Sequence, residues 1–168
     1  DNFYKWKAGA RMSGGQCNGH PWGSGGTWSF KLDDPKHILN RAFKGGGFWH
    51  KDEIYQYKPE TYVGPGQLRL LVSLDLNKPQ TMKPLDRNAG LKKQYTEGGR
   101  TVPVSWIRTF EGGRVFYTNL GHNESTYWNP AVSQHYLDGL QYALGDLKAD
   151  ATPSSKISRK EVLAPAAP

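Results

Sequence analysis

The chain of 168 residues contains a single cysteine and no apolar run near the roughly 18 to 20 residues needed to span a bilayer. A lone Cys17 excludes an internal disulfide and says little about the compartment. We therefore expect no membrane span. The sequence shows no signal-peptide pattern, although a start at Asp1 rather than Met is consistent with processing. The location stays unknown, with a periplasmic or secreted one favoured over a cytoplasmic one.

Continuous apolar strands are also scarce. The hydrophobic share is 36% and the mean hydropathy is −0.72, which is low for a sheet buried on both faces. Only residues 68–74 and 115–117 approach such a run. Twenty glycines and eleven prolines indicate that much of the chain is loop.

No block of like charge stands out, although the net charge is +7 and the pI is about 9.5. The longest basic runs are pairs such as Lys92-Lys93 and Arg159-Lys160. Nucleic-acid binders concentrate such residues on one helix or patch, so we expect no nucleic-acid partner. A positive surface can still attract anionic saccharides or an acidic protein.

Residues 101–147 have the clearest order. Strands are expected at 102–109 and 114–119, after earlier strand-like pieces at 27–32, 54–57 and 68–76. A helix is expected from Pro130 to Leu144, since Asn129 is a good N-cap and Gly145 suits a left-handed C-terminal residue. His135 inside this helix is interpreted as structural. One apolar stripe of the helix is expected to be buried: Val132, Tyr136, Leu137, Leu140 and Leu144.

Three polar loops carry the candidate chemistry: residues 16–22, 49–55 and 122–124. His20 could bind a metal or a sugar hydroxyl. Asp52 and Glu53 would point to opposite faces of an extended chain, so only one of them can enter a given pocket. His122 follows a strand, where a base and its orienting group, or two metal ligands, could be placed. Each loop taken alone is more typical of solvated polar surface.

Several short segments follow one another in a fixed order: Asp1–Trp6, Gly19–Pro21, Asp33–His37, Asp52–Tyr55, Gly113–His122, Trp128–Val132 and Gly139–Gly145. Together they resemble the ThuA-like (trehalose-utilisation) domain over roughly residues 1 to 147. The resemblance implies an α/β fold with a flavodoxin-like, three-layer mixed sheet, related to class I glutamine amidotransferases. Nothing in the chain corresponds to the first strands of that sheet. We therefore expect the C-terminal two-thirds of the domain in residues 1–148, followed by a Pro/Ala/Ser-rich tail or linker in residues 149–168.

The resemblance also implies a function in carbohydrate metabolism. The expected step is metal-assisted or acid/base chemistry on a sugar, a disaccharide or a keto-sugar, as in a hydrolase, lyase or isomerase. The alternative is a non-catalytic saccharide-binding or assembly module, which the 12% aromatic content would suit. A Cys-dependent amidotransferase is not expected, because no apolar strand precedes Cys17 to form a nucleophile elbow.

The predicted site draws its residues from the three loops. His122 and Glu53 are the catalytic candidates, and His20 with His122 would hold a divalent metal, zinc by preference. The substrate-binding candidates are Trp22, Asp52, Tyr55, Asn123 and Glu124. A small saccharide is the expected ligand. The expected macromolecular partner is a chain or segment that completes the sheet, or a second copy of the chain in a homo-oligomer.

Overall fold

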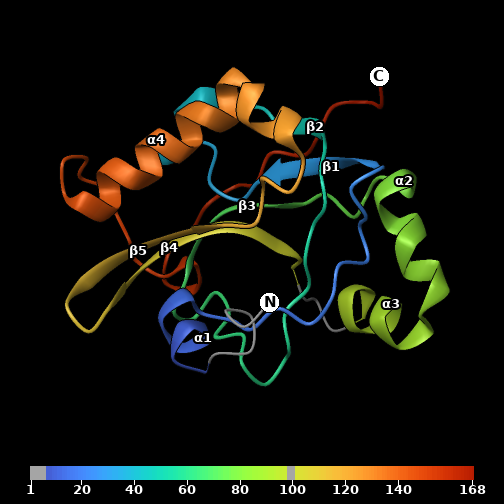
Figure 1. The fold of residues 1–168 in the computed structure, drawn as a ribbon, viewed down its shortest axis with the longest axis horizontal. Coiled ribbons are helices and arrows are strands. Elements are labelled where there is room, and N and C mark those ends of the chain that lie inside the picture. Colours follow the sequence, from blue (N-terminus) through green and yellow to red (C-terminus); the bar gives the residue numbers. More distant parts are fainter. Residues whose placement is uncertain (1–6, 98–100) are drawn as a thin grey trace.

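The computed structural model describes residues 7–97 and 101–168, which fold around one five-stranded sheet (Figure 1). The strands are β1 (Thr27–Leu32), β2 (Phe48–Lys51), β3 (Arg69–Leu74), β4 (Pro103–Phe110) and β5 (Gly113–Thr118). Their order across the sheet is β2-β1-β3-β4-β5, and each neighbouring pair is antiparallel. The expected α/β class is confirmed. The described residues contribute no parallel pair, so they do not form the parallel part of a mixed sheet.

Helices cover both faces of the sheet. The longest helix is α4 (Pro130–Leu144), which lies over one face, while α1 (Lys7–Ser13) lies under the other (Figure 1). The helices α2 (Pro79–Met82) and α3 (Ala89–Thr96) lie beside the sheet, at the end where β1 begins. Short 3-10 turns complete the elements: η2 (Ile38–Phe43), η3 (Lys83–Arg87), η4 (Glu124–Trp128) and η5 (Ser154–Lys156). None of the helices in the described ranges has the length and apolarity required to cross a membrane.

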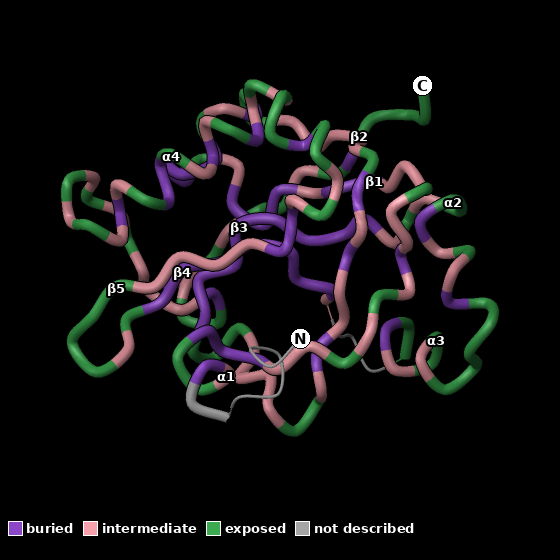
Figure 2. The backbone as a smooth tube through the Cα atoms, in the orientation of Figure 1, coloured by how far each residue is buried: buried purple, intermediate pink, exposed green. Residues whose placement is uncertain are grey.

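The apolar run at residues 68–76 forms a strand as its sequence predicts, and this strand, β3, lies at the centre of the sheet. All six of its residues are buried, and Figure 2 shows burial continuing into β4 while the hairpin tip stays exposed. The strand expected at 54–57 is replaced by isolated bridges, in which Ile54 pairs with Trp22 and Tyr57 with Cys17. An additional strand, β2, overlaps the start of the predicted loop 49–55, because residues 48–51 pair with β1. Because that pairing joins residues about twenty positions apart, no local pattern in the sequence predicts β2.

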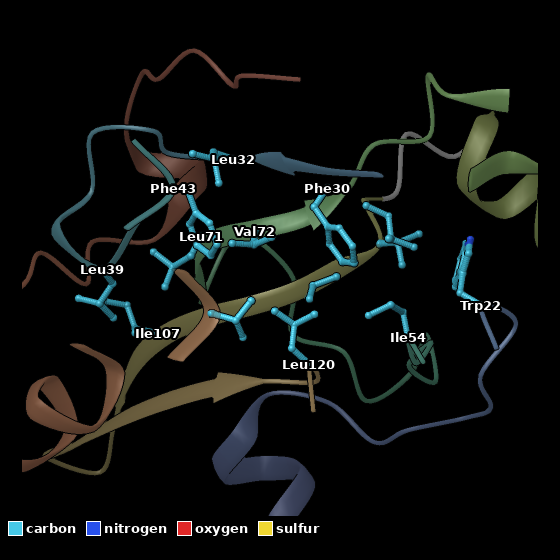
Figure 3. Close-up of a cluster of buried hydrophobic side chains, with 14 of the residues drawn as sticks. Trp22, Phe30, Leu32, Leu39, Phe43, Ile54, Leu71, Val72, Ile107 and Leu120 are labelled. Carbon is cyan, nitrogen blue, oxygen red and sulfur yellow. The ribbon is translucent and has the colours of Figure 1, made fainter. Parts of the chain in front are cut away.

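The main core lies between the sheet, α4 and η2. Figure 3 shows it continuing from Leu39 on η2 through Phe30 and Ile107 to Trp22. A smaller cluster on the α1 side contains Leu70 and Trp106. Trp106 and Ile107 are successive residues of β4, and their side chains belong to the smaller cluster and to the main core, respectively. This is the alternation that a strand requires.

Helix α4 begins and ends where its sequence predicts, but it presents a different face. Asn129 accepts hydrogen bonds from the amides of Ala131 and Val132, and Gly145 has a φ of 100°. The predicted stripe is wrong beyond its start, because Leu137, Leu140 and Leu144 are 48, 57 and 74% exposed. The buried residues are Val132, His135, Asp138, Gly139 and Tyr142. Gly139 explains the rotation, since a Cβ there would lie 2.3 Å from the Phe116 ring.

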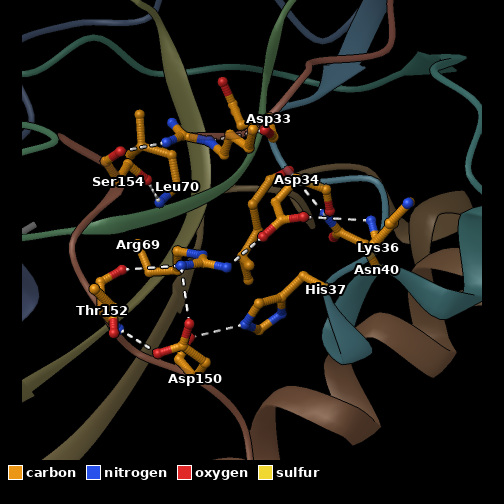
Figure 4. A network of polar contacts seen from close by, with 12 residues as sticks. Asp33, Asp34, Lys36, His37, Asn40, Arg69, Leu70, Asp150, Thr152 and Ser154 are labelled. Atoms are coloured by element: carbon orange, nitrogen blue, oxygen red, sulfur yellow. Dashed lines mark hydrogen bonds and ion pairs between the residues drawn. The ribbon is translucent and has the colours of Figure 1, made fainter. Parts of the chain in front are cut away.

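Residues 150–168 lie along the domain as an extended arm. Leu32 and Val162 exchange two backbone hydrogen bonds of 2.9 Å, and Leu70 donates to the Ser154 hydroxyl at 2.8 Å. Figure 4 shows Asp150 and Thr152 at the start of the arm, both in contact with Arg69 on β3. The sequence leaves open whether this segment is a free linker or a docked arm. In the structure the segment is docked, and the surface that it contacts belongs to residues 32 and 68–70 of the same chain.

Candidate functional site

Three loops that are distant in the sequence place one carboxylate between two imidazoles. The Glu53 Oε2 atom lies 3.3 Å from His20 Nδ1 and 3.9 Å from His122 Nε2. The Glu53 side chain is 12% exposed, whereas those of His20 and His122 are 61 and 44% exposed. The expected meeting of these residues is thus seen in the structure, with the carboxylate at the base and both rings at the surface.

Asp52 holds the His122 loop rather than facing the solvent. Its side chain is fully buried, and its carboxylate accepts backbone hydrogen bonds from Gly121 at 2.6 Å, Asn123 at 2.8 Å and Glu53 at 3.0 Å. The amides on both sides of His122 are therefore tied to the residue before Glu53. The substrate-binding role expected for Asp52 is corrected to a positioning role. Of the two neighbouring acids, Asp52 thus faces the backbone and Glu53 faces the two imidazoles.

Asn123 adds a second tie to the same loop. Its side-chain amide donates to the carbonyl oxygens of Ser24 at 2.9 Å and Lys51 at 3.1 Å. Gly121 makes the close turn that this arrangement needs, because its φ is 115° and a Cβ there would lie 2.6 Å from the Tyr127 hydroxyl. The His122 loop is thus fixed by the ends of β2 and by the segment that precedes β1.

Trp22 belongs to the core and not to a substrate platform. It is 0% exposed, and its indole N–H donates to the Thr81 carbonyl at 2.8 Å. The expectation that its ring faces a sugar is therefore wrong, because no face of the ring is open. Trp22 still serves the site indirectly, since its carbonyl accepts the Ile54 amide at 2.8 Å and aligns the His20 loop with Glu53.

The other two candidates lie at the edge of the site. Tyr55 is half-buried and meets the His20 ring edge-on, with a centroid distance of 6.4 Å and an angle of 88°. Glu124 is exposed and begins η4, one residue beyond Asn123. Tyr55 can restrict the His20 ring, and Glu124 adds negative charge near the loop without a contact to the trio His20–Glu53–His122.

His50 was not selected from the sequence, although it stands in the same predicted loop. Its Nε2 lies 3.0 Å from the Thr126 hydroxyl and its Nδ1 is 3.5 Å from Asn129 Nδ2, so it joins β2 to η4. Burial lowers the pKa of His50, which keeps the ring neutral. The Trp49-His50 pair was the only local signal, and it does not reveal the Thr126 contact.

A second histidine makes a serine contact that resembles a catalytic pair but is closed to substrate. His135 Nε2 lies 2.8 Å from the Ser105 hydroxyl, Nδ1 lies 2.6 Å from the Leu39 carbonyl, and the residue is 0% exposed. Burial lowers the pKa of His135 to about 4. His135 is therefore structural, as predicted.

Cys17 lacks the environment of a nucleophile. Its thiol lies 3.8 Å from the Gly19 carbonyl, and burial raises the pKa of the thiol. A raised pKa keeps the sulfur protonated, whereas a reactive cysteine needs the thiolate.

The described residues include no group of three or more His, Cys, Asp or Glu side chains arranged to hold a metal ion. The trio His20–Glu53–His122 is a cluster of one carboxylate and two ionisable imidazoles.

Comparison with known proteins places the chain in a family. A family model described as ThuA, trehalose utilisation, matches residues 1–143 of 168. No curated protein and no solved structure matched the chain. The match covers most of the chain, including all three loops of the site. The chain therefore belongs to the ThuA, or trehalose utilisation, family.

Proposed function

We propose that the trio His20–Glu53–His122 performs acid/base chemistry on a saccharide, either a disaccharide or its oxidised keto form. The family implies a role related to carbohydrate utilisation. The observation that carries the chemical proposal is the shielded Glu53 carboxylate, 12% exposed, between two accessible imidazoles. An imidazole exchanges protons near neutral pH, and a carboxylate on one ring nitrogen orients the other nitrogen toward substrate.

Within the trio, the geometry favours His20 as the group that transfers the proton. Its Nδ1 faces Glu53 at 3.3 Å, and among the described residues no polar group contacts its Nε2. With a proton on Nδ1, the lone pair of Nε2 can accept a proton from a sugar hydroxyl or from a carbon next to a keto group. Glu53 then stabilises the imidazolium that forms. His20, which the sequence indicates as a ligand for a metal or a sugar hydroxyl, thus takes the role of base.

His122 stands on the other side of the carboxylate. Its Nε2 lies 3.9 Å from Glu53, while its Nδ1 is 3.5 Å from the Asn123 side-chain oxygen. Both nitrogens thus face neighbouring groups of the protein. We assign His122 to orienting Glu53 and binding a substrate hydroxyl, and expect its loss to affect KM more than kcat.

The test compares His20→Asn, Glu53→Gln and His122→Asn in assays with trehalose and with its keto form. We expect His20→Asn and Glu53→Gln to lower kcat by about 10²-fold or more, the range of general acid–base catalysis. Glu111→Gln is the control, because Glu111 lies at the hairpin beyond the opposite end of β5. Unchanged kcat in both His20→Asn and Glu53→Gln would refute the proposal.

The same variants separate the two remaining alternatives. Saccharide binding without turnover, unchanged in Glu53→Gln, would instead indicate a binding or assembly module. A stoichiometric divalent metal in the purified protein, lost together in His20→Asn and His122→Asn, would indicate metal-assisted chemistry. Elemental analysis measures this directly.

A further inference from the structure

The described part of the sheet contains two equally buried arginines in opposite electrostatic situations. Arg69 on β3 and Arg108 on β4 are each 6% exposed. Arg69 contacts the carboxylates of Asp34 at 2.5 Å and Asp150 at 3.2 Å (Figure 4). Arg108 has no carboxylate within 4.0 Å among the described residues. A buried charge without a counter-ion loses its hydration and so lowers the stability of the folded state. An anion beside Arg108 would remove this cost.

The partners of Arg108 are neutral and its hydrogen bonds are long. The guanidinium donates to the Arg11 carbonyl at 3.2 Å and to the Gln67 side-chain oxygen at 3.3 Å, and lies 5.0 Å from the Phe110 ring centroid. Its Nε is buried with no hydrogen-bond partner in the part of the chain that the structure describes, which is also true of the Arg69 Nε. Burial lowers the pKa of Arg108, and no carboxylate of the described ranges lies close enough to oppose that effect.

The guanidinium borders a pocket on the α1 side of the sheet. The pocket measures about 710 Å³, and its walls include Arg11, Lys58 and Arg108 against one carboxylate, Glu60. Lys58 forms no ion pair with any described residue. Gln67, which also lines the pocket, is exposed, so its side chain can turn away at little cost. An oxyanion in its place would accept shorter, charge-assisted hydrogen bonds.

We propose that this pocket binds a small ligand through a carboxylate or phosphate group held by Arg108. Lys58 supplies further positive charge, and Arg11 adds a guanidinium that is paired with Glu111 at 3.7 Å at the exposed rim. Phe110 supplies an apolar wall for the rest of the ligand. The site is separate from the trio His20–Glu53–His122. Arg108 pairs with Val115 near the start of β5, whereas His122 follows the other end of that strand. The proposal is therefore independent of the proposed chemistry.

The experiment titrates the protein with sodium phosphate and with sodium acetate at constant ionic strength, using calorimetry and thermal unfolding. A ligand that binds only the folded state raises the unfolding temperature in a saturable way. Gln67→Glu is the main variant, because it places a carboxylate of the chain itself beside Arg108. We expect it to weaken anion binding at least tenfold and to raise the unfolding temperature without anion.

Two further variants complete the design. Arg108→Lys keeps the charge but removes the planar fork, and should also weaken binding about tenfold. Gln94→Glu adds the same charge on α3, away from the pocket, and should leave binding unchanged. The acetate and phosphate arms distinguish which oxyanion the pocket prefers. The proposal is overturned if neither anion binds saturably to the unaltered protein. It is also overturned if Gln67→Glu and Gln94→Glu bind the anion equally well.

Discussion

At the scale of single residues, Asp52 determines where His122 stands. Its buried carboxylate accepts the amides of Gly121, Asn123 and Glu53. In Asp52→Asn the charge is lost and one of the two oxygens becomes an NH₂ group that meets an amide donor. We expect a loss of about 2–4 kcal/mol in the free energy of unfolding, since hydrogen bonds to a charged group contribute about 1.5–3 kcal/mol each.

Urea denaturation measures this loss, and Asp86→Asn is the matched control at an exposed position on η3. Equal stability of the two variants would contradict the positioning role of Asp52. The activity of Asp52→Asn should fall as well, because the Glu53–His122 distance depends on the same three hydrogen bonds.

His135 makes the stability of the fold depend on pH. Burial lowers its pKa to about 4, against about 6.5 for an unfolded histidine. Between these values the unfolded chain binds more protons than the native one, so stability is complete above pH 6.5 and falls as the pH drops to 4. The total loss is about 3 kcal/mol, at 1.36 kcal/mol per pH unit of difference. Lowered pKa values of His37 and His50 add in the same direction, while the raised pKa of Asp33 opposes them.

Unfolding midpoints between pH 4 and 7 test this prediction. His135→Gln can keep contacts to Ser105 and Leu39 without titrating, so its pH dependence should be flatter than that of the unaltered protein. Parallel curves for the two proteins would show that His135 is not responsible.

At the scale of elements, the contact between α4 and β5 requires a glycine. A Cβ at Gly139 would lie 2.3 Å from the Phe116 ring, so Gly139→Ala should destabilise the protein by about 1–3 kcal/mol despite the better helix propensity of alanine. Gly90→Ala in α3 is the control, because its nearest atom would be Asn88 Oδ1 at 3.5 Å. Thermal unfolding should show a lower midpoint for the first variant alone. If Phe116→Leu does not reduce the cost of Gly139→Ala, the ring is not its cause.

The same elements show what a local pattern can predict. The ends of α4 were predictable because capping depends on residues within a few positions, such as Asn129 and Gly145. The buried face of α4 was not, because hydropathy favours the leucines whereas the close approach to Phe116 favours Gly139. Likewise, β3 was evident from its apolar run, but β2 required its partner β1.

At the scale of the whole molecule, the arm of residues 150–168 contributes to stability. Its contacts include the Leu32–Val162 pair, the Ser154 contacts with β3, and the Ala164 amide that donates to Asp75 at 3.0 Å. Deletion of residues 150–168 should lower the unfolding midpoint by several degrees, because each buried hydrogen bond contributes about 0.5–1.5 kcal/mol. Calorimetry measures the shift. Removal of the exposed residues 166–168 is the control, and equal midpoints for both truncations would mean that the arm does not dock in solution.

The meeting of the three central residues of the candidate site was predictable, whereas the positions of their neighbours were not. The family motifs selected His20, Glu53 and His122, and these three come together. The motifs could not show that Asp52 turns inward to bind three amides, or that Trp22 fills the core. A polar residue next to a catalytic candidate has the same sequence signature whether it faces substrate or backbone.

The sequence by itself determined the features that depend on short stretches of chain: the ThuA family, the central strand β3, the ends of α4 and the residues of the trio. Only the tertiary structure decided the features that depend on contacts between distant residues. These are the pairing of β2, the rotation of α4, the docking of the arm, the inward turn of Asp52, and an Arg108 buried without a carboxylate among the described residues. The physical reason is that local propensity acts over one or two helical turns, whereas burial and charge pairing depend on the whole fold.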